Sequence, residues 1–244
     1  MSQYCSNPTL LYNILKGTNS FLVGSCTLPF LFPHNDLTSP LHIIPLQIAC
    51  RTKHIPRFLT FFNRMGYPCD FFINLDATSY PSRFTLCSAS GDFRVMLIHD
   101  DDSPLFRVAY LQYTAFMNAL SPDIFVFLYP KLTFNQTSIT TYDAPGSQFH
   151  LIITLDSCAL SELNILSDFG FRIKTNNHVQ DESCPASGCK SYRRADDKET
   201  ARINLVINQN TQGYIDSVIS WHLGGSNCIV QDSPFYSHFV SVLS

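Results

Sequence analysis

A glycine-serine pair, Gly24-Ser25, is the feature of this sequence best placed to do chemistry, because it follows the apolar run Phe21-Leu22-Val23 directly. A short apolar run predicts a buried strand, and a Gly-Ser pair at its end predicts a tight bend. Backbone N–H groups that converge in such a bend can bind a phosphate group. We therefore take Gly24 and Ser25 as candidate nucleotide- or phosphate-binding residues.

The same bend offers a serine and a cysteine as nucleophiles, in the order Gly24-Ser25-Cys26. It lacks the Gly-x-Ser-x-Gly pattern of the hydrolase nucleophile elbow. No single aspartate or histidine stands out as the catalytic partner, so the sequence argues against a hydrolase.

Three residues in the charged segment near the C-terminus, His178, Cys184 and Cys189, are candidate zinc ligands, with His222 or Cys228 as a fourth. Zinc takes four such ligands in a tetrahedron. The spacings of six and five residues differ from the two-residue gaps of common zinc modules. An exposed loop with unpaired thiols is the favoured interpretation, and we expect no metal there.

Two further groups have simpler interpretations. His34, His42 and His99 lie near the proposed bend and could ligate a metal, but histidines beside apolar strands are usually hydrogen-bonded. Basic and aromatic residues at 190–194 resemble an RNA contact, whereas the acids at 196–199 largely cancel their charge. We expect a solvated charged loop there.

The elements that would position these groups follow from periodicity and from proline and glycine signals. Helices are predicted at Pro8 to Leu15 (with Gly17 past the end), Cys26 to Phe32, Ile55 to Met65 and Ser157 to Phe169. Strands are predicted at Phe21 to Val23, Leu41 to Leu46, Phe71 to Leu75, Arg83 to Ser88, Phe93 to His99, Ile124 to Tyr129, Arg202 to Ile207 and Val218 to Leu223.

This order of elements indicates an α+β fold, with a mixed sheet and flanking helices followed by a β-rich C-terminal part. We divide the chain at residue 135, into a core of residues 1–135 and a C-terminal region of residues 136–244. The two parts could also form one continuous domain. The charged segment at 176–202 is predicted to be an exposed loop.

Composition limits the partners. The 244 residues are 45% hydrophobic but only 14% charged, which favours a surface patch covered by a protein partner, or poor solubility of the chain alone. A net charge of −3 gives no overall attraction to nucleic acid, although a local basic patch remains compatible with it. No signal peptide and no apolar segment of membrane-spanning length is recognised. We expect an intracellular protein, in the cytoplasm or the nucleus, that does not bind membranes.

Several motifs in the order of this chain resemble those of nucleotidyltransferase-like proteins of mushroom-forming fungi. The matches are the Gly24-Ser25 bend, the helix from Phe58-Leu59 to Gly66-Tyr67, and the Met117-Asn118 pair. They continue with Tyr129-Pro130-Lys131-Leu132-Thr133, Cys184-Pro185 and Trp221-His222-Leu223-Gly224-Gly225. The resemblance implies a nucleotidyltransferase-like sheet, with Gly24 and Ser25 at the phosphates of a nucleotide.

The sequence departs from this family at its metal-binding acids. The family's Asp-Leu-Asp triplet falls on Pro40-Leu41-His42, or in a competing register on Asp36-Leu37-Thr38. Its third acid falls within Val95-Met96-Leu97-Ile98, which contains none. Because Mg²⁺ requires oxygen ligands, and two ions are needed to clamp the reacting oxygens, Asp36 alone cannot supply the site.

The acidic run Asp100-Asp101-Asp102 lies just past the third position. A register slip of four residues would bring one of these acids to the site. A solvated exit from the strand is the favoured interpretation.

The leading hypothesis is therefore a catalytically inactive, degenerate nucleotidyltransferase (a pseudoenzyme) that binds a nucleotide or a protein partner and needs no cofactor. In the first alternative, an active enzyme uses Asp36, Mg²⁺ and acids that the sequence does not identify. In the second, the chain is a structural or interaction module with no ligand.

Overall fold

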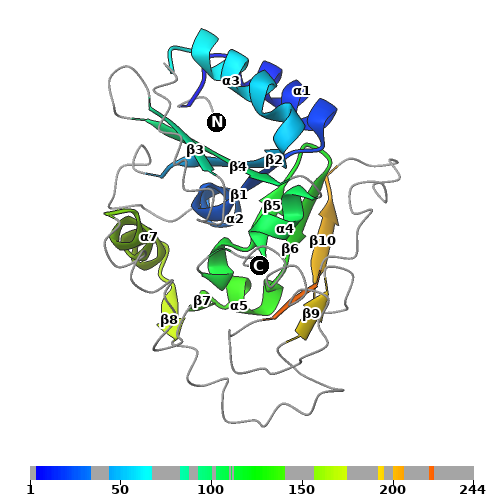
Figure 1. Cartoon of the computed structure of the whole chain (residues 1–244). Helices are drawn as coiled ribbons and strands as arrows, with labels where there is room; N and C mark the ends of the chain where they lie inside the picture. The colour runs from blue at the N-terminus through cyan, green and yellow to red at the C-terminus, as the bar shows by residue number, and fades with distance from the viewer. Residues whose placement is uncertain are drawn as a thin grey trace, which may run out of the picture.

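The computed structural model describes residues 4–33, 44–67, 83–87, 93–100, 103–109, 111, 113–140, 157–174, 192–194, 200–205 and 220–222. A seven-stranded mixed sheet is its main feature (Figure 1), with the strand order β10-β6-β5-β1-β2-β4-β3. Strand β2 runs parallel to β4, and the other neighbouring pairs in this sheet are antiparallel. The strands are β1 (Phe21–Val23), β2 (Leu46–Arg51), β3 (Arg83–Cys87), β4 (Arg94–Asp100), β5 (Asn118–Leu120), β6 (Ile124–Phe127) and β10 (Ala201–Asn204).

Helices flank the sheet, so the fold is α+β as predicted. Helices α1 (Pro8–Thr18) and α3 (Ile55–Arg64) lie side by side on one face (Figure 1). The chain also forms α2 (Leu28–Leu31), α4 (Pro104–Val108), α5 (Pro130–Phe134), α7 (Ser157–Asp168) and the 3-10 turns η1 (Gly24–Thr27), η3 (Thr52–His54) and η4 (Thr114–Phe116).

Two small sheets accompany the large one. Strand β7 (Thr137–Ile139) pairs with β8 (Arg172–Lys174) in parallel. Strand β9 (Tyr192–Arg194) pairs with β11 (Ser220–His222) in antiparallel fashion. Strand β9 and the first two residues of β10 therefore lie within the segment 176–202 that was predicted to be a loop, and the prediction is wrong for these residues. Strand β10 pairs with β6, so the large sheet takes strands from both sides of residue 135.

Helix α1 begins as its sequence predicts and ends later. The side chain of Asn7 accepts a hydrogen bond from the backbone N–H of Leu10 at 3.0 Å, and Pro8 occupies the first turn. Such a cap stabilises a helix start. Gly17 was predicted to lie past the end but is helical. Asn19 ends the helix instead, in the left-handed conformation with φ 48°, which asparagine tolerates better than most residues.

Strand β2 lies further along the chain than predicted. The predicted strand ran from Leu41 to Leu46, whereas β2 begins at Leu46. Pro45 explains the difference, because proline has no N–H to donate and is excluded from the interior of a strand that pairs on both sides. Strand β2 does pair on both sides, with β1 and β4. This shift changes which residues approach the Gly24-Ser25 bend.

The other predicted elements that fall among the described residues agree with the structure within a few residues at their ends, whereas α4, α5, β5, β7 and β8 were not predicted. Helix α3 buries Ile55, Phe58, Phe61 and Phe62, the face that its apolar spacing predicts. The segment Cys26 to Phe32 divides into η1 and α2. The predicted strand at residues 71–75 lies outside the described residues.

The core of the described chain is rich in aromatic side chains, as the composition predicts. Phe21, Phe58, Phe62, Phe116 and Phe127 are among its largest fully buried side chains. Phe32 contacts Phe171 edge to face, with ring centroids 5.7 Å apart. This contact links the end of α2 to the residues that follow α7. Among the described residues, no helix is both long enough and apolar enough to cross a bilayer.

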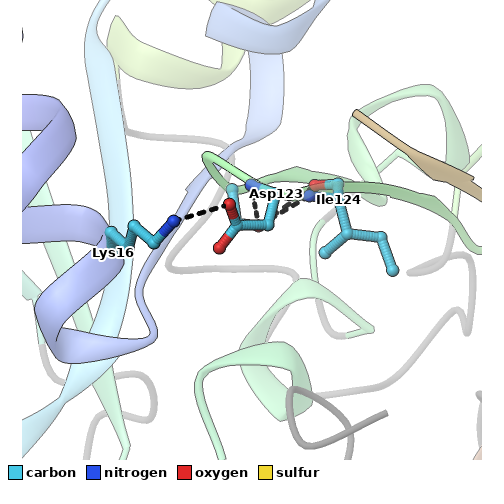
Figure 2. Close-up of polar contacts among 4 residues, drawn as sticks. Lys16, Asp123 and Ile124 are labelled. Carbon is cyan, nitrogen blue, oxygen red and sulfur yellow. Dashed lines mark hydrogen bonds and ion pairs between the residues drawn. The ribbon is translucent and has the colours of Figure 1, made fainter. Parts of the chain in front are cut away.

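An ion pair joins the last turn of α1 to the β5–β6 hairpin (Figure 2). Lys16 Nζ lies 3.1 Å from Asp123 Oδ1; the Asp123 side chain is 1% exposed and that of Lys16 is 41% exposed. The hydroxyl of Ser121 accepts hydrogen bonds from the backbone N–H groups of Asp123 and Ile124. The hairpin thus holds a buried carboxylate in place for a partly hydrated cation.

We predict that Lys16→Met destabilises the protein by about 1–2 kcal/mol. The value lies between that of a surface pair and that of a fully buried pair, because only Asp123 is fully desolvated. Lys16→Arg serves as the control and should stay within about 0.5 kcal/mol of the wild type. Urea unfolding measures both, and equal stability of the three proteins would contradict the prediction.

Candidate functional site

The Gly24-Ser25 bend forms where β1 ends and η1 begins. Gly24 has φ +72°, a conformation that favours glycine over any residue with a Cβ. Two side chains of η1 bond back to the bend. Thr27 Oγ1 donates to the carbonyl of Gly24 at 2.7 Å, and Cys26 Sγ donates to that of Val23 at 3.0 Å. The predicted tight bend is therefore present and is fixed by its own side chains.

Gln47 on β2 packs directly against this bend. Residue Leu22 pairs with Ile48 across the β1–β2 ladder, which places Gln47 opposite Val23. A Cβ built on Gly24 would overlap Gln47 Oε1. The carboxamide of Gln47 therefore fills the space that a side chain at position 24 would need.

Two polar atoms at the bend have no hydrogen-bond partner among the described residues, Ser25 Oγ and Gln47 Oε1. Ser25 is 0% exposed and Gln47 is 3% exposed. A buried polar atom left unpaired costs about 1–3 kcal/mol, so such atoms require an explanation. One is a hydroxyl that can donate and the other is a carbonyl oxygen that can only accept. A ligand that accepts a hydrogen bond would satisfy Ser25 Oγ, and one that donates a hydrogen bond would satisfy Gln47 Oε1.

Strand β4 places Met96 beside Gln47. These two residues are partners in the parallel β2–β4 ladder, so their side chains lie on the same face of the sheet. The next partners on that face are Ala49 and Ile98. Met96 lies within the segment Val95 to Ile98, where the proteins that this sequence resembles have their third metal-binding acid. Beside the bend, the two neighbouring strands thus present neutral side chains, and the charged partners Arg51 and Asp100 follow on the same face at the far end of the ladder.

Asp100 lies at the far end of the same ladder. Its partner is Arg51, and four residues of strand separate it from Met96, or about 13 Å. Asp100 is buried, and it accepts a hydrogen bond from the N–H of Ser103 at 3.3 Å. The prediction of a solvated strand exit is therefore wrong for Asp100. Asp101 and Asp102 lie outside the described residues.

His99 belongs to a different environment from Gln47. It pairs with Cys50 across the ladder, and alternation along the strand places both on the opposite face of the sheet from Gln47 and Met96. His99 Nδ1 lies 2.9 Å from Thr52 Oγ1 in a hydrogen bond. This is the hydrogen-bonded histidine that the sequence favours over a metal ligand.

Several predicted site residues lie outside the described residues. They are Asp36, the Pro40-Leu41-His42 triplet, His34, and the zinc candidates His178, Cys184 and Cys189. In the part of the chain that is described, no three His, Cys, Asp or Glu side chains lie close enough to hold a metal ion.

Sequence reasoning missed Gln47. Its signal was present, because Gln47 is the one uncharged polar residue within the apolar stretch from Ile43 to Cys50. A lone polar residue in a strand buried on both faces marks a place where the interior has a polar atom to satisfy.

No family model, curated protein or solved structure matches the chain in the comparisons made with known proteins. The site is therefore interpreted from its own residues.

Proposed function

We propose that this chain is a nucleotidyltransferase-like protein that has lost metal-dependent catalysis and acts by binding a ligand or a protein partner. One observation carries the proposal. The two strands beside the Gly24-Ser25 bend present Gln47 and Met96 on the face that meets it, and neither side chain supplies the carboxylate with which enzymes hold two Mg²⁺ ions.

The unpaired atoms at the bend support a binding role. Ser25 Oγ can donate a hydrogen bond and Gln47 Oε1 can accept one. A nucleotide phosphate could take the hydroxyl hydrogen bond without any cation, at a bend whose glycine conformation permits close approach. A ligand held in this way would be bound and not turned over.

Burial supports a second candidate, a structural or interaction module with no ligand. Ser25 and Gln47 are almost fully buried, and the Gln47 carboxamide fills the space beside Gly24. A ligand would have to displace that carboxamide before it could reach the bend. The two candidates therefore differ in whether Gln47 moves.

A thermal-shift measurement with ATP, CTP, GTP and UTP, each with EDTA or with Mg²⁺, distinguishes these candidates. We expect a nucleotide to raise Tm equally with and without metal, since binding to the folded state alone stabilises it. Ser25→Ala should abolish the shift. Thr133→Val is the matched control, because Thr133 Oγ1 is also buried and unpaired but belongs to α5.

Two other outcomes of the thermal-shift measurement would favour a different function. No shift with any nucleotide would leave the module without a ligand as the better account. A shift that requires Mg²⁺, together with transfer of labelled nucleotide to RNA or protein that Asp36→Ala abolishes, would overturn the proposal and establish an active transferase.

A further inference from the structure

Helices α1 and α3 form an antiparallel pair on one face of the large sheet (Figure 1). At one end of the pair, the hydroxyl of Ser6, just before α1, donates a hydrogen bond to Met65 Sδ, just after α3, at 3.3 Å. At the other end, the guanidinium of Arg57 in the first turn of α3 lies 3.6 Å from the position that a Cβ on Gly17 would occupy. The end of each helix therefore lies beside the start of the other.

Helical periodicity shows which other side chains border this pair. Leu10 precedes Gly17 by about two helical turns, so the two residues lie on the same flank of α1. Arg64 follows Arg57 by the same interval on α3. Because the helices are antiparallel, Leu10 and Arg64 both lie about 10 Å from the Gly17–Arg57 contact, in the same direction. We refer to these four residues as the α1–α3 seam.

The seam combines an apolar side chain with two cations, and all four of its residues are exposed. Leu10 is 42% exposed although its side chain is large and apolar. A partner that covered it with apolar carbon would gain the free energy of removing that surface from water. Arginine is also enriched where proteins bind one another.

The two helices carry positive charge alone. Together α1 and α3 contain three cations, Lys16, Arg57 and Arg64, and no acid. Lys16 is paired with Asp123 on the β5–β6 hairpin. The two seam arginines are therefore the charges of this helix pair that an anionic partner would meet.

The surroundings of Arg57 add to this positive charge. Partial burial lowers the pKa of His54, and the positive charges of three neighbours lower it further: Lys53, Arg51 and Arg57. Arg51 is the ladder partner of Asp100, so it is not counted in the seam. Lys53 belongs to the turn before α3. The proposal below therefore uses the arginines of α3 alone.

We propose that the α1–α3 seam binds an acidic amphipathic helix of a protein partner. In a helix that lies along the seam, two acids with the same spacing as Arg57 and Arg64 share one face and reach both arginines. Each carboxylate can form bidentate hydrogen bonds with a guanidinium. An apolar side chain one turn away from the acid that meets Arg64 would cover Leu10.

Leu10 is what favours a protein over other anionic partners. A phosphate backbone, in nucleic acid or at a lipid surface, would pair with the arginines but would leave Leu10 in water. An acidic amphipathic helix supplies carboxylates and apolar carbon on one face. The inference rests on the protein-partner part of the proposed function and does not depend on nucleotide binding at the Gly24-Ser25 bend.

Fluorescence anisotropy with a designed peptide tests the proposal. The probe is a labelled helical peptide of about 16 residues, with two glutamates spaced like Arg57 and Arg64 and a leucine one turn from each. The double variant Arg57→Ala/Arg64→Ala should bind it at least about tenfold more weakly than the wild type, and Leu10→Ala at least about threefold more weakly. A peptide of the same composition with adjacent glutamates should also bind at least about threefold more weakly.

Two control variants remove similar groups outside the seam. Arg172→Ala/Lys174→Ala also deletes two exposed cations. Tyr12→Ala removes a side chain of α1 that is 36% exposed. Tyr12 lies about 200° around the helix from Leu10, and so on the opposite flank. Both controls should bind the acidic peptide within about twofold of the wild type.

An exchange of charges separates direct contact from an effect on folding. Arg57→Glu/Arg64→Glu should bind a peptide with lysines in place of the glutamates at least about tenfold more tightly than it binds the acidic peptide. A variant that had merely lost its structure would bind neither peptide. Circular dichroism before each titration checks that the variant is folded.

Four results would overturn the proposal. They are equal binding by the seam variants and the controls, no detectable binding of the wild type to the acidic peptide at about 20 mM KCl, no recovery on charge exchange, and tighter binding to an RNA duplex or to phosphatidylserine vesicles than to the peptide. The nucleotide-induced shift in Tm should be the same in the seam variants as in the wild type. Failure at the seam with that shift intact would overturn this inference alone.

Discussion

Gly24→Ala is expected to destabilise the protein by about 2–5 kcal/mol, a large part of the stability of a typical domain. Two costs combine at this position. A residue with a Cβ at φ +72° costs about 1–2 kcal/mol, and the overlap of that Cβ with the Gln47 carboxamide adds an overpacking cost of about 1–3 kcal/mol. Urea unfolding followed by circular dichroism measures the sum.

A second glycine separates the two costs. Gly66 has φ +85°, but a Cβ there would meet nothing within 4 Å. Gly66→Ala should therefore cost only the conformational part, about 1–2 kcal/mol. If Gly24→Ala lowers the free energy of unfolding no more than Gly66→Ala does, Gln47 does not pack against the bend. The contact between Gln47 and Gly24 would then be contradicted.

A double-mutant cycle tests the contact directly. In Gly24→Ala/Gln47→Ala the overlap is removed while the strained φ remains. We expect the double variant to be more stable than the sum of the two single changes by at least about 1 kcal/mol. Strict additivity would show that the two residues do not interact.

The position of Gln47 illustrates what the sequence could predict and what it could not. The apolar run before Gly24 predicted β1 correctly, and the Gly24-Ser25 pair predicted the bend, because both signals are local. The approach of Gln47 depends on the register between β1 and β2, which is set by long-range pairing. Pro45 was the local clue that β2 begins at Leu46, and the predicted strand ran through it instead.

The helices also show some features that the local sequence predicts and others that it does not. The face of α3 that is buried follows from its spacing, whereas the end of α1 depended on which residue takes the left-handed conformation. Glycine is the usual residue type at such a helix end, but Asn19 adopts the left-handed conformation here and Gly17 does not. The partners of buried polar atoms are equally long-range information. Lys16 and Asp123 are separated by 107 residues, and nothing local in either segment predicts their ion pair.

Alkaline pH is expected to destabilise the protein steeply between pH 9 and pH 11. Burial raises the pKa of the Cys26 thiol from 9.0 to about 11 and that of Cys50 from 9.0 to about 12. Above pH 9 the unfolded chain releases these protons while the folded protein retains them. Stability therefore falls as pH rises, by about 1.4 kcal/mol per pH unit for each thiol.

The sign and the window follow from the same two pKa values. Below about pH 8 both thiols are protonated in both states and contribute no pH dependence. Between pH 9 and pH 11 the two together should remove about 4 kcal/mol. Burial also raises the pKa of Tyr67, which adds to the loss in the same direction.

Unfolding in urea at pH 8, 9, 10 and 11 under reducing conditions measures this slope. Cys26→Ala and Cys50→Ala should each lower it by about 1.4 kcal/mol per pH unit over this range. Leu28→Ala is the matched control, because Leu28 is fully buried and does not titrate. It should lower stability at every pH and leave the slope unchanged. A slope that neither cysteine variant alters would contradict the prediction.

The two thiols also report on the bend itself, because they lie on either side of the Gly24–Gln47 contact. Cys26 belongs to η1 and donates to the carbonyl of Gln47 at 3.6 Å, whereas Cys50 lies three residues beyond Gln47 on β2. If the bend opens without global unfolding, Cys26 should be alkylated faster than Cys50 at pH 9. Equal rates that follow the global stability would mean that a ligand can reach Ser25 only when the whole sheet unfolds, and binding at the bend would then be excluded.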